Sequence, residues 1–155
     1  MTILIRQLQE RDIDSLVKSF YPLKKPRDQF ELFWKEHQAG SRVTFVACVG
    51  EKVVGYTNLV WGSDYKAFQE LGIPEINNMH ILDEFQKQGI GTALIKEAER
   101  LAFVQGKQEI GIGFGLTPDY GTAQRLYPKL GYIPDGRGAQ STLWGDVLYL
   151  TKQLK

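Results

Sequence analysis

Apolar and polar positions along the chain repeat with two different periods. Alternation predicts a strand with one buried face, and apolar residues three or four positions apart predict a helix with one buried side. Alternation predicts strands at residues 2–8, 43–49, 53–61, from 75 onward, 109–116, 132–133 and 146–151. Helical spacing predicts helices from about residue 11 until Pro22, at 28–38, in part at 65–71, after a turn at 86–91, and at 119–130. Because strands and helices mix without strict alternation, we expect an α/β (or α+β) fold, a mixed central β-sheet flanked by helices, in a single domain spanning residues 1–155.

The helix after the turn is expected to be amphipathic. Lys96, Glu99 and Arg100 should face water. The buried side carries an apolar stripe made of Ile90, Leu94, Ala98, Leu101 and Ala102. In the helix that follows, Pro128 removes one backbone hydrogen bond and should loosen the last turn. Between the two closing strands, the glycine-rich segment 136–138 predicts a loop.

The strand that begins at Glu75 divides its side chains between two faces if it is regular. One face then carries Glu75, Asn77, Met79 and Ile81, and the other carries Asn78 and His80.

The strand at 109–116 has an unusual face, formed by Gly111, Gly113 and Gly115. A strand face made only of glycine is costly unless something must come close to the backbone. Two explanations remain open: a bulge or a tightly packed helix, or a ligand arm that passes over this face.

Composition indicates an ordinary globular protein. Of the 155 residues, 43% are hydrophobic and 24% are charged, and a net charge of +1 gives no overall field that attracts nucleic acid or membrane. The basic run Lys24–Arg27 is expected to be a solvated loop. The single cysteine, Cys48, excludes an internal disulfide and should be a buried packing residue. Two histidines and one cysteine give no metal-ligand spacing, so we expect no metal. Because the sequence shows no signal peptide or membrane-spanning run, we expect a soluble cytoplasmic protein.

The turn Gln86–Gly91 is the first candidate for chemistry. Gly89 and Gly91 allow another molecule to approach the backbone, and the following helix directs its free N–H groups and the positive end of its dipole into the same space. This arrangement favours an anion, usually phosphate, although glycines that merely ease a tight turn explain the same residues. A nicotinamide-dependent enzyme is disfavoured, because Leu94 stands where the fingerprint GxGxxG has its third glycine.

Two segments resemble motifs of the GNAT N-acetyltransferase family, in the right order. The turn matches Q/R-x-x-G-x-G/A, the family's pyrophosphate-binding motif, and AQRLYPKLGYIP at Ala123–Pro134 is similar to the A-x-x-L-Y-x-K-L-G-[FY] segment that ends the acetyl-CoA half of its domains. This resemblance spans nearly the whole chain. Tyr120 departs from it, because many members carry there an asparagine that contacts the cofactor, and Pro128 is a second departure. The resemblance implies acetyl-CoA as co-substrate, held by Ile81, Leu82, Gln86, Lys87, Gln88, Gly89, Ile90, Gly91 and Thr92.

The resemblance also implies direct transfer of an acetyl group to a primary amine, with Glu75 as general base and Tyr127 as the acid for the leaving thiolate. A primary alkylamine has a pKa of about 10 and must lose a proton before it attacks, and a thiolate with a pKa of about 8.5 can take one. From the residues alone, Glu75 could instead be a surface or salt-bridged glutamate, with His80 as base or merely hydrogen-bonded. Tyr127 could equally be a core tyrosine.

No sequence feature identifies the acceptor, which we expect to be a small-molecule or peptide amine. Acids and aromatic rings that could hold an amine cation lie in predicted loops, at Trp61, Asp64, Tyr65, Asp135 and Trp144. The alternative function is a non-catalytic module of the same fold that binds an acyl-CoA, although such a module would be expected to lack Glu75 and Tyr127. We expect no nucleic-acid or membrane partner, and a homodimer stays open.

Overall fold

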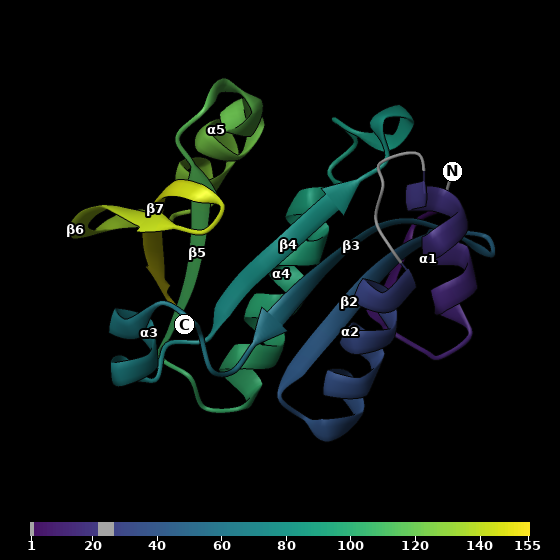
Figure 1. The fold of residues 1–155 in the computed structure, drawn as a ribbon, viewed down its shortest axis with the longest axis horizontal. Coiled ribbons are helices and arrows are strands. Elements are labelled where there is room, and N and C mark those ends of the chain that lie inside the picture. The colour runs from purple at the N-terminus through teal and green to yellow at the C-terminus, as the bar shows by residue number, and fades with distance from the viewer. Residues whose placement is uncertain (1, 22–26) are drawn as a thin grey trace.

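Strands and helices follow one another in a mixed order, as the sequence predicts. The computed structural model describes residues 2–21 and 27–155, so most of the predicted loop at Lys24–Arg27 lies outside the described residues. The elements are β1 (Leu4–Gln7), α1 (Asp12–Phe20), α2 (Arg27–Ala39), β2 (Arg42–Val49), β3 (Lys52–Val60), α3 (Lys66–Leu71), β4 (Glu75–Ile81), the short 3₁₀ helix η2 (Asp83–Phe85), α4 (Ile90–Val104), β5 (Glu109–Gly115), the 3₁₀ helix η3 (Pro118–Tyr120), α5 (Gly121–Lys129), β6 (Ile133–Thr142) and β7 (Gly145–Gln153). The strands form one sheet in the order β1-β2-β3-β4-β5-β7-β6 (Figure 1).

β4 and β5 form the parallel pair of this otherwise antiparallel sheet. Their pairing covers two positions, Glu75 with Gly111 and Ile76 with Ile112, after which the two strands diverge (Figure 1). A parallel pair needs a crossover connection, and α4 provides it. From Asn77 onward, β4 pairs with β3 alone.

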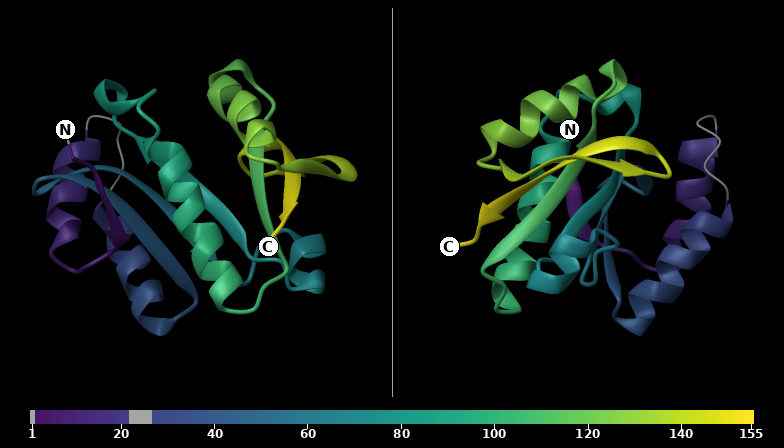
Figure 2. Two further views of the ribbon diagram at one scale, coloured as in Figure 1. Left: turned by 180° about the vertical axis from the view of Figure 1, so that it is seen from behind. Right: turned by 60° about the vertical axis from the view of Figure 1, so that its left-hand side comes forward.

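Helices cover both faces of the sheet (Figure 2). On one face, α1 and α2 place aromatic rings around Tyr56 of β3, which is fully buried. The ring partners are Phe20 at 5.1 Å, Phe30 at 5.6 Å and Phe33 at 6.0 Å between centroids. Such tilted and edge-to-face pairs add to the stabilisation from buried area. On the other face, α4 packs against β3 and β4, so the predicted mixed sheet flanked by helices is confirmed.

The strand β4 is not regular, and the predicted division of its side chains is wrong. Asn78 has a φ of +55°, and the pairing with β3 shifts register at this point. Asn77 pairs with Asn58 and His80 pairs with Tyr56, two positions away on the same face of β3. A bulge inserts one extra residue, so His80 returns to the face that carries Glu75 and Asn77. Met79 and Ile81 lie on the α4 side, next to Gly91.

The glycine face of β5 is filled by aromatic rings of the protein itself. A Cβ at Gly111 would lie 2.2 Å from the Phe68 ring of α3, and one at Gly115 would lie 2.4 Å from the Tyr120 ring of η3. At Gly113 the neighbours are Val147 and Tyr149 of β7. The glycines therefore admit packed side chains, and the explanation by a passing ligand arm is wrong.

The glycine-rich segment 136–138 is not a loop, contrary to the sequence prediction. β6 runs through it to Thr142, and its register against β7 shifts between Pro134 and Ala139. Gly136 and Gly138 allow this irregularity because both have positive φ, which glycine adopts without steric cost.

Glu99 does not face water, although Lys96 and Arg100 do. Its carboxylate accepts hydrogen bonds from Tyr132 Oη at 2.7 Å and from Lys152 Nζ at 3.1 Å. The side chain is 14% exposed as a result. Periodicity within α4 could not show this, because both donors belong to the C-terminal part of the chain.

Asp12, the first residue of α1, is buried and ion-paired. Its carboxylate accepts hydrogen bonds from Arg6 at 2.7 and 2.9 Å and from the Gln9 N–H at 2.7 Å. Burial alone would raise the pKa of Asp12, but these hydrogen bonds and the Arg6 charge outweigh it, and the pKa is lowered. The pair therefore stabilises the fold above the ordinary pKa of 3.8 and ceases to do so as pH falls through the lowered value.

Asp12→Asn is expected to lower the free energy of unfolding by about 2–3 kcal/mol at pH 7, because Arg6 would keep its charge without an ionised partner. Thermal unfolding measures this loss. Asp14→Asn is the control: its ion pair with Arg27 is also short, at 2.8 Å, but the Asp14 side chain is 84% exposed. Its loss should stay below about 1 kcal/mol. Equal losses in the two variants would contradict the role given to Asp12.

Candidate active site

Helix α4 begins with an uncapped N-terminus. Gly89 is the N-cap residue, with a φ of +82°, and neither a side-chain cap nor an acidic residue lies in the first turn. The N–H groups of Ile90, Gly91 and Thr92 have no acceptor within an α-helix, and no acidic side chain of the first turn compensates the positive end of the dipole. This helix end therefore suits an anion with several oxygens, such as a pyrophosphate.

The glutamines of the turn bind its own backbone. Gln86 donates from Nε2 to the carbonyl of Ile81 at 3.1 Å, and Gln88 donates to the carbonyl of Glu84 at 3.2 Å. Lys87 is exposed and has a φ of +61°. Gln86 and Gln88 thus hold the shape of the turn, while Lys87 brings a positive charge to it.

The two glycines of the turn have different structural roles. A Cβ at Gly89 would meet nothing within 4 Å, whereas one at Gly91 would lie 3.3 Å from Ile81 Cδ1 and 3.6 Å from Met79 Cε. Gly89 therefore supplies the positive φ and leaves open space in front of the helix, whereas Gly91 lets α4 approach β4. Ile81 packs on Gly91, and the Leu82 side chain is buried in the core.

Glu75 lies at the start of β4, where β4 still pairs with β5. Its side chain is buried, at 9% exposure, and its Oε1 accepts a hydrogen bond from Ser63 Oγ at 2.5 Å. Within the described ranges, no lysine or arginine forms an ion pair with it. Burial and the negative charge of Asp64 raise the pKa of Glu75, and the Ser63 hydrogen bond lowers it in part. Glu75 is thus not a surface or salt-bridged residue, and a raised pKa suits a general base near neutral pH.

Aromatic rings lie beside Glu75. Tyr65 stacks on Tyr149 with centroids 3.9 Å apart, and Phe68 meets both rings edge-on at 4.7 and 5.5 Å. Burial and the charges of Glu75 and Asp64 raise the pKa of Tyr149 to about 12. Tyr149 is therefore neutral at physiological pH.

Of the residues predicted to surround the acceptor, Tyr65 and Asp135 contact each other in the structure. Tyr65 Oη donates to Asp135 Oδ2 at 2.6 Å, and Arg137 donates to the same carboxylate from its backbone N–H and its guanidinium. Because the Asp135 side chain is 1% exposed and already bonded, it holds Tyr65 in place and is not placed to hold an amine. The other three residues differ in exposure: Trp61 is half-buried, Asp64 is exposed and Trp144 is 87% exposed in the β6–β7 turn.

Tyr127 of α5 combines a packed ring with an available hydroxyl. The residue is 6% exposed, and its ring lies 6.1 Å from that of Phe114 and 6.3 Å from that of Tyr132. In the part of the chain that the structure describes, its hydroxyl has no hydrogen-bond partner, yet it is not sealed from solvent. Burial raises the pKa of Tyr127 to about 12, so the hydroxyl keeps its proton at neutral pH.

Sequence reasoning missed Ser63 and Tyr149 beside Glu75. Ser63 is a lone serine in a predicted loop, and Tyr149 lies in a closing strand, so no local pattern singles out either residue. Only the pairing of β5 with both β4 and β7 brings Tyr149 close.

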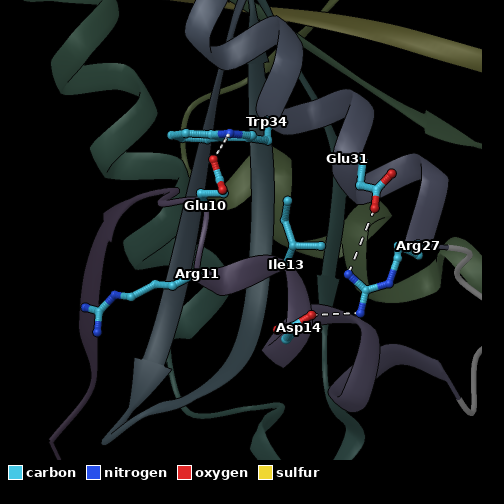
Figure 3. A pocket seen from close by; sticks show the side chains of 7 residues that line it. All are labelled: Glu10, Arg11, Ile13, Asp14, Arg27, Glu31 and Trp34. Atoms are coloured by element: carbon cyan, nitrogen blue, oxygen red, sulfur yellow. Dashed lines mark hydrogen bonds and ion pairs between the residues drawn. The ribbon is translucent and has the colours of Figure 1, made fainter.

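A surface groove between α1 and α2 is separate from this site (Figure 3). Three of its charged residues pair with one another: Arg27 lies 2.8 Å from Asp14 and 4.0 Å from Glu31. The groove is lined by Glu10, Arg11, Ile13, Asp14, Arg27, Glu31 and Trp34. None of these residues belongs to the turn or contacts Glu75.

Neither a metal centre nor a membrane span is found in residues 2–21 and 27–155. No group of three or more His, Cys, Asp or Glu side chains there could hold a metal ion. No helix in those ranges is both long and apolar enough to cross a membrane.

A parallel pair that parts after two positions, connected by a helix with an open, uncapped N-terminus, defines an acetyltransferase fold of the GNAT type. The profile of the acetyltransferase (GNAT) family matches residues 10–132, and the chain belongs to this family. A search of curated proteins finds no match.

Solved structures share the fold along the whole chain. An N-acetyltransferase from Staphylococcus aureus Mu50 superposes with a TM-score of 0.78 at 15% identity, covering 100% of both chains. The PaiA N-acetyltransferase of Thermoplasma acidophilum, in complex with coenzyme A, gives 0.71 at 16% identity over 99% of both chains. A phosphinothricin acetyltransferase from Sinorhizobium meliloti, in complex with acetyl-CoA, gives 0.76 at 18% identity over 99% of this chain and 89% of that one. At such identities the likeness establishes the fold.

Proposed function

We propose that this protein transfers the acetyl group of acetyl-CoA to a primary amine by direct attack, within one catalytic domain formed by residues 1–155. The observation that carries the proposal is the buried Glu75 with its raised pKa, on the strand that leads into the anion site of α4. Acetyl-CoA, when bound, supplies a thioester as the acyl donor. The coenzyme A and acetyl-CoA complexes of two structural neighbours support this choice of donor.

The residues of the turn fit a coenzyme A pyrophosphate. The N–H groups of Ile90, Gly91 and Thr92 are free to donate, Gly89 leaves the space before them open, and Lys87 adds a positive charge. No acidic residue in the first turn of α4 repels an anion.

Glu75 and Tyr127 hold and move the protons that the reaction needs. A primary amine has a pKa of about 10, so it is mostly protonated at neutral pH and cannot attack. Glu75 accepts that proton at a carboxylate oxygen, directly or through an ordered water. Tyr127 keeps its own proton up to a pKa of about 12 and donates it from Oη to a thiolate leaving group.

Gly89→Leu tests the placement of the pyrophosphate, with Gly106→Leu as the matched control at the other end of α4. Both glycines have positive φ, +82° and +85°, and a Cβ would meet nothing within 4 Å at either. Both variants should therefore lose about 1–2 kcal/mol of stability from backbone strain. Only Gly89→Leu should also lose acetyl-CoA affinity, by about tenfold or more, because its side chain enters the space in front of the helix. Calorimetric titration that gives equal affinities would refute this placement.

A further inference from the structure

Ser63 is fixed between the backbone of its own loop and Glu75. Its Oγ accepts a hydrogen bond from the Tyr65 N–H at 2.9 Å and lies 2.5 Å from Glu75 Oε1. The residue is 1% exposed, so solvent does not compete for the hydroxyl. A serine hydroxyl has one proton, and an ionised carboxylate can only accept. The Ser63 proton must therefore point at Glu75 whenever Glu75 is ionised.

The loop that presents Ser63 is itself anchored to the C-terminal strands. Tyr65, two residues later, stacks on Tyr149 of β7 with ring centroids 3.9 Å apart. Its hydroxyl donates to Asp135 of β6 at 2.6 Å. A chain of contacts thus runs from β6 and β7 through Tyr65 to Ser63 and ends on Glu75.

We propose that Ser63 is a positioning residue for the reaction: its hydroxyl holds the Glu75 carboxylate in one orientation and stabilises its ionised form. The inference rests on the proposed role of Glu75 as the base. A buried carboxylate without a donor would remain protonated to higher pH, and a protonated Glu75 cannot accept the proton of an amine. Ser63 therefore offsets part of the effect of burial and keeps the base usable near neutral pH.

Few other titratable groups act on Glu75. Asp64, from the same loop, raises the pKa of Glu75 through its negative charge. Tyr149, from β7, is neutral up to a pKa of about 12 and contributes no charge at neutral pH. At the same register, the neighbouring strands contribute Val60 and Gly111, which do not titrate. Removing the Ser63 hydroxyl should therefore shift the Glu75 titration upward without compensation from a neighbour.

The test compares Ser63→Ala with Ser63→Thr, which keeps a hydroxyl, and with Ser141→Ala. Ser141 also donates to a carboxylate, Asp146 at 3.2 Å, but this pair is exposed in the β6–β7 hairpin. The pKa of Glu75 is read by NMR titration of protein with ¹³C-labelled glutamate, assigned with Glu75→Gln. The pH profile of kcat/KM with acetyl-CoA and a primary amine is measured in parallel.

Ser63→Ala should raise the pKa of Glu75, move the acid limb of the kcat/KM profile to higher pH, and lower kcat/KM at pH 7 by about tenfold or more. Ser63→Thr should restore both, and Ser141→Ala should change neither. An unchanged Glu75 titration in Ser63→Ala would overturn the inference. A raised pKa with an unmoved rate profile would support the contact and instead overturn Glu75 as the base, which is the failure of the proposed function.

Discussion

Glu75→Gln is expected to lower kcat by about 100-fold or more at neutral pH, since glutamine keeps the shape of the side chain but cannot accept a proton. The deficit should shrink as the pH approaches the pKa of the acceptor amine, because a growing fraction of the amine then arrives neutral. A steady-state assay across pH measures both effects. A rate equal to that of the parent at every pH would remove Glu75 from the mechanism.

Stability should not fall in the Glu75→Gln variant. Burial raises the pKa of Glu75 in the folded protein, so its ionisation at neutral pH costs folding free energy that glutamine avoids. Melting curves at pH 7 are expected to show an equal or higher Tm. Glu109→Gln is the matched control, because it makes the same change at a half-buried position on β5, next to β4. It should leave kcat unchanged.

Tyr127→Phe is expected to lower kcat by roughly 10²- to 10⁴-fold, with only a modest loss of acetyl-CoA affinity. The change removes the hydroxyl that has no partner among the described residues and keeps the ring that packs near Phe114. The free energy of unfolding should therefore change by about 1 kcal/mol or less. A melting curve, a cofactor titration and a steady-state assay on this variant give the three quantities.

Tyr132→Phe makes the same change 6.3 Å away, measured between ring centroids. Its hydroxyl donates to Glu99 at 2.7 Å, and the residue is 1% exposed, so here the hydroxyl is structural. This variant should lose Tm, by about 2–4 °C for each kcal/mol of lost stability, and keep its kcat. If Tyr127→Phe instead loses Tm and keeps its kcat, Tyr127 is a core residue. If the parent protein binds acetyl-CoA without any turnover, that result would favour the non-catalytic alternative.

Local sequence determined most of the elements and predicted the candidate anion site. Apolar spacing predicted a helix at residues 28–38, and the structure has α2 at Arg27–Ala39. The glycine turn also follows from sequence alone, since it needs only Gly89 at a positive φ and the first N–H groups of the helix behind it. Such features depend on residues that are neighbours along the chain, and for this reason a pattern can reveal them.

Tertiary structure decided which side chains surround the glutamate. The bulge at Asn78 turned His80 back to the face of Glu75, and it arises from the register of β4 against β3. Ser63 reaches Glu75 across a loop, and Tyr149 reaches it through the pairing of β5 with β7. The sequence by itself thus predicted where an anion should bind and named Glu75 as a candidate base. Burial, the Ser63 donor and the raised pKa of Glu75 were decided by contacts between strands and loops that are distant along the chain.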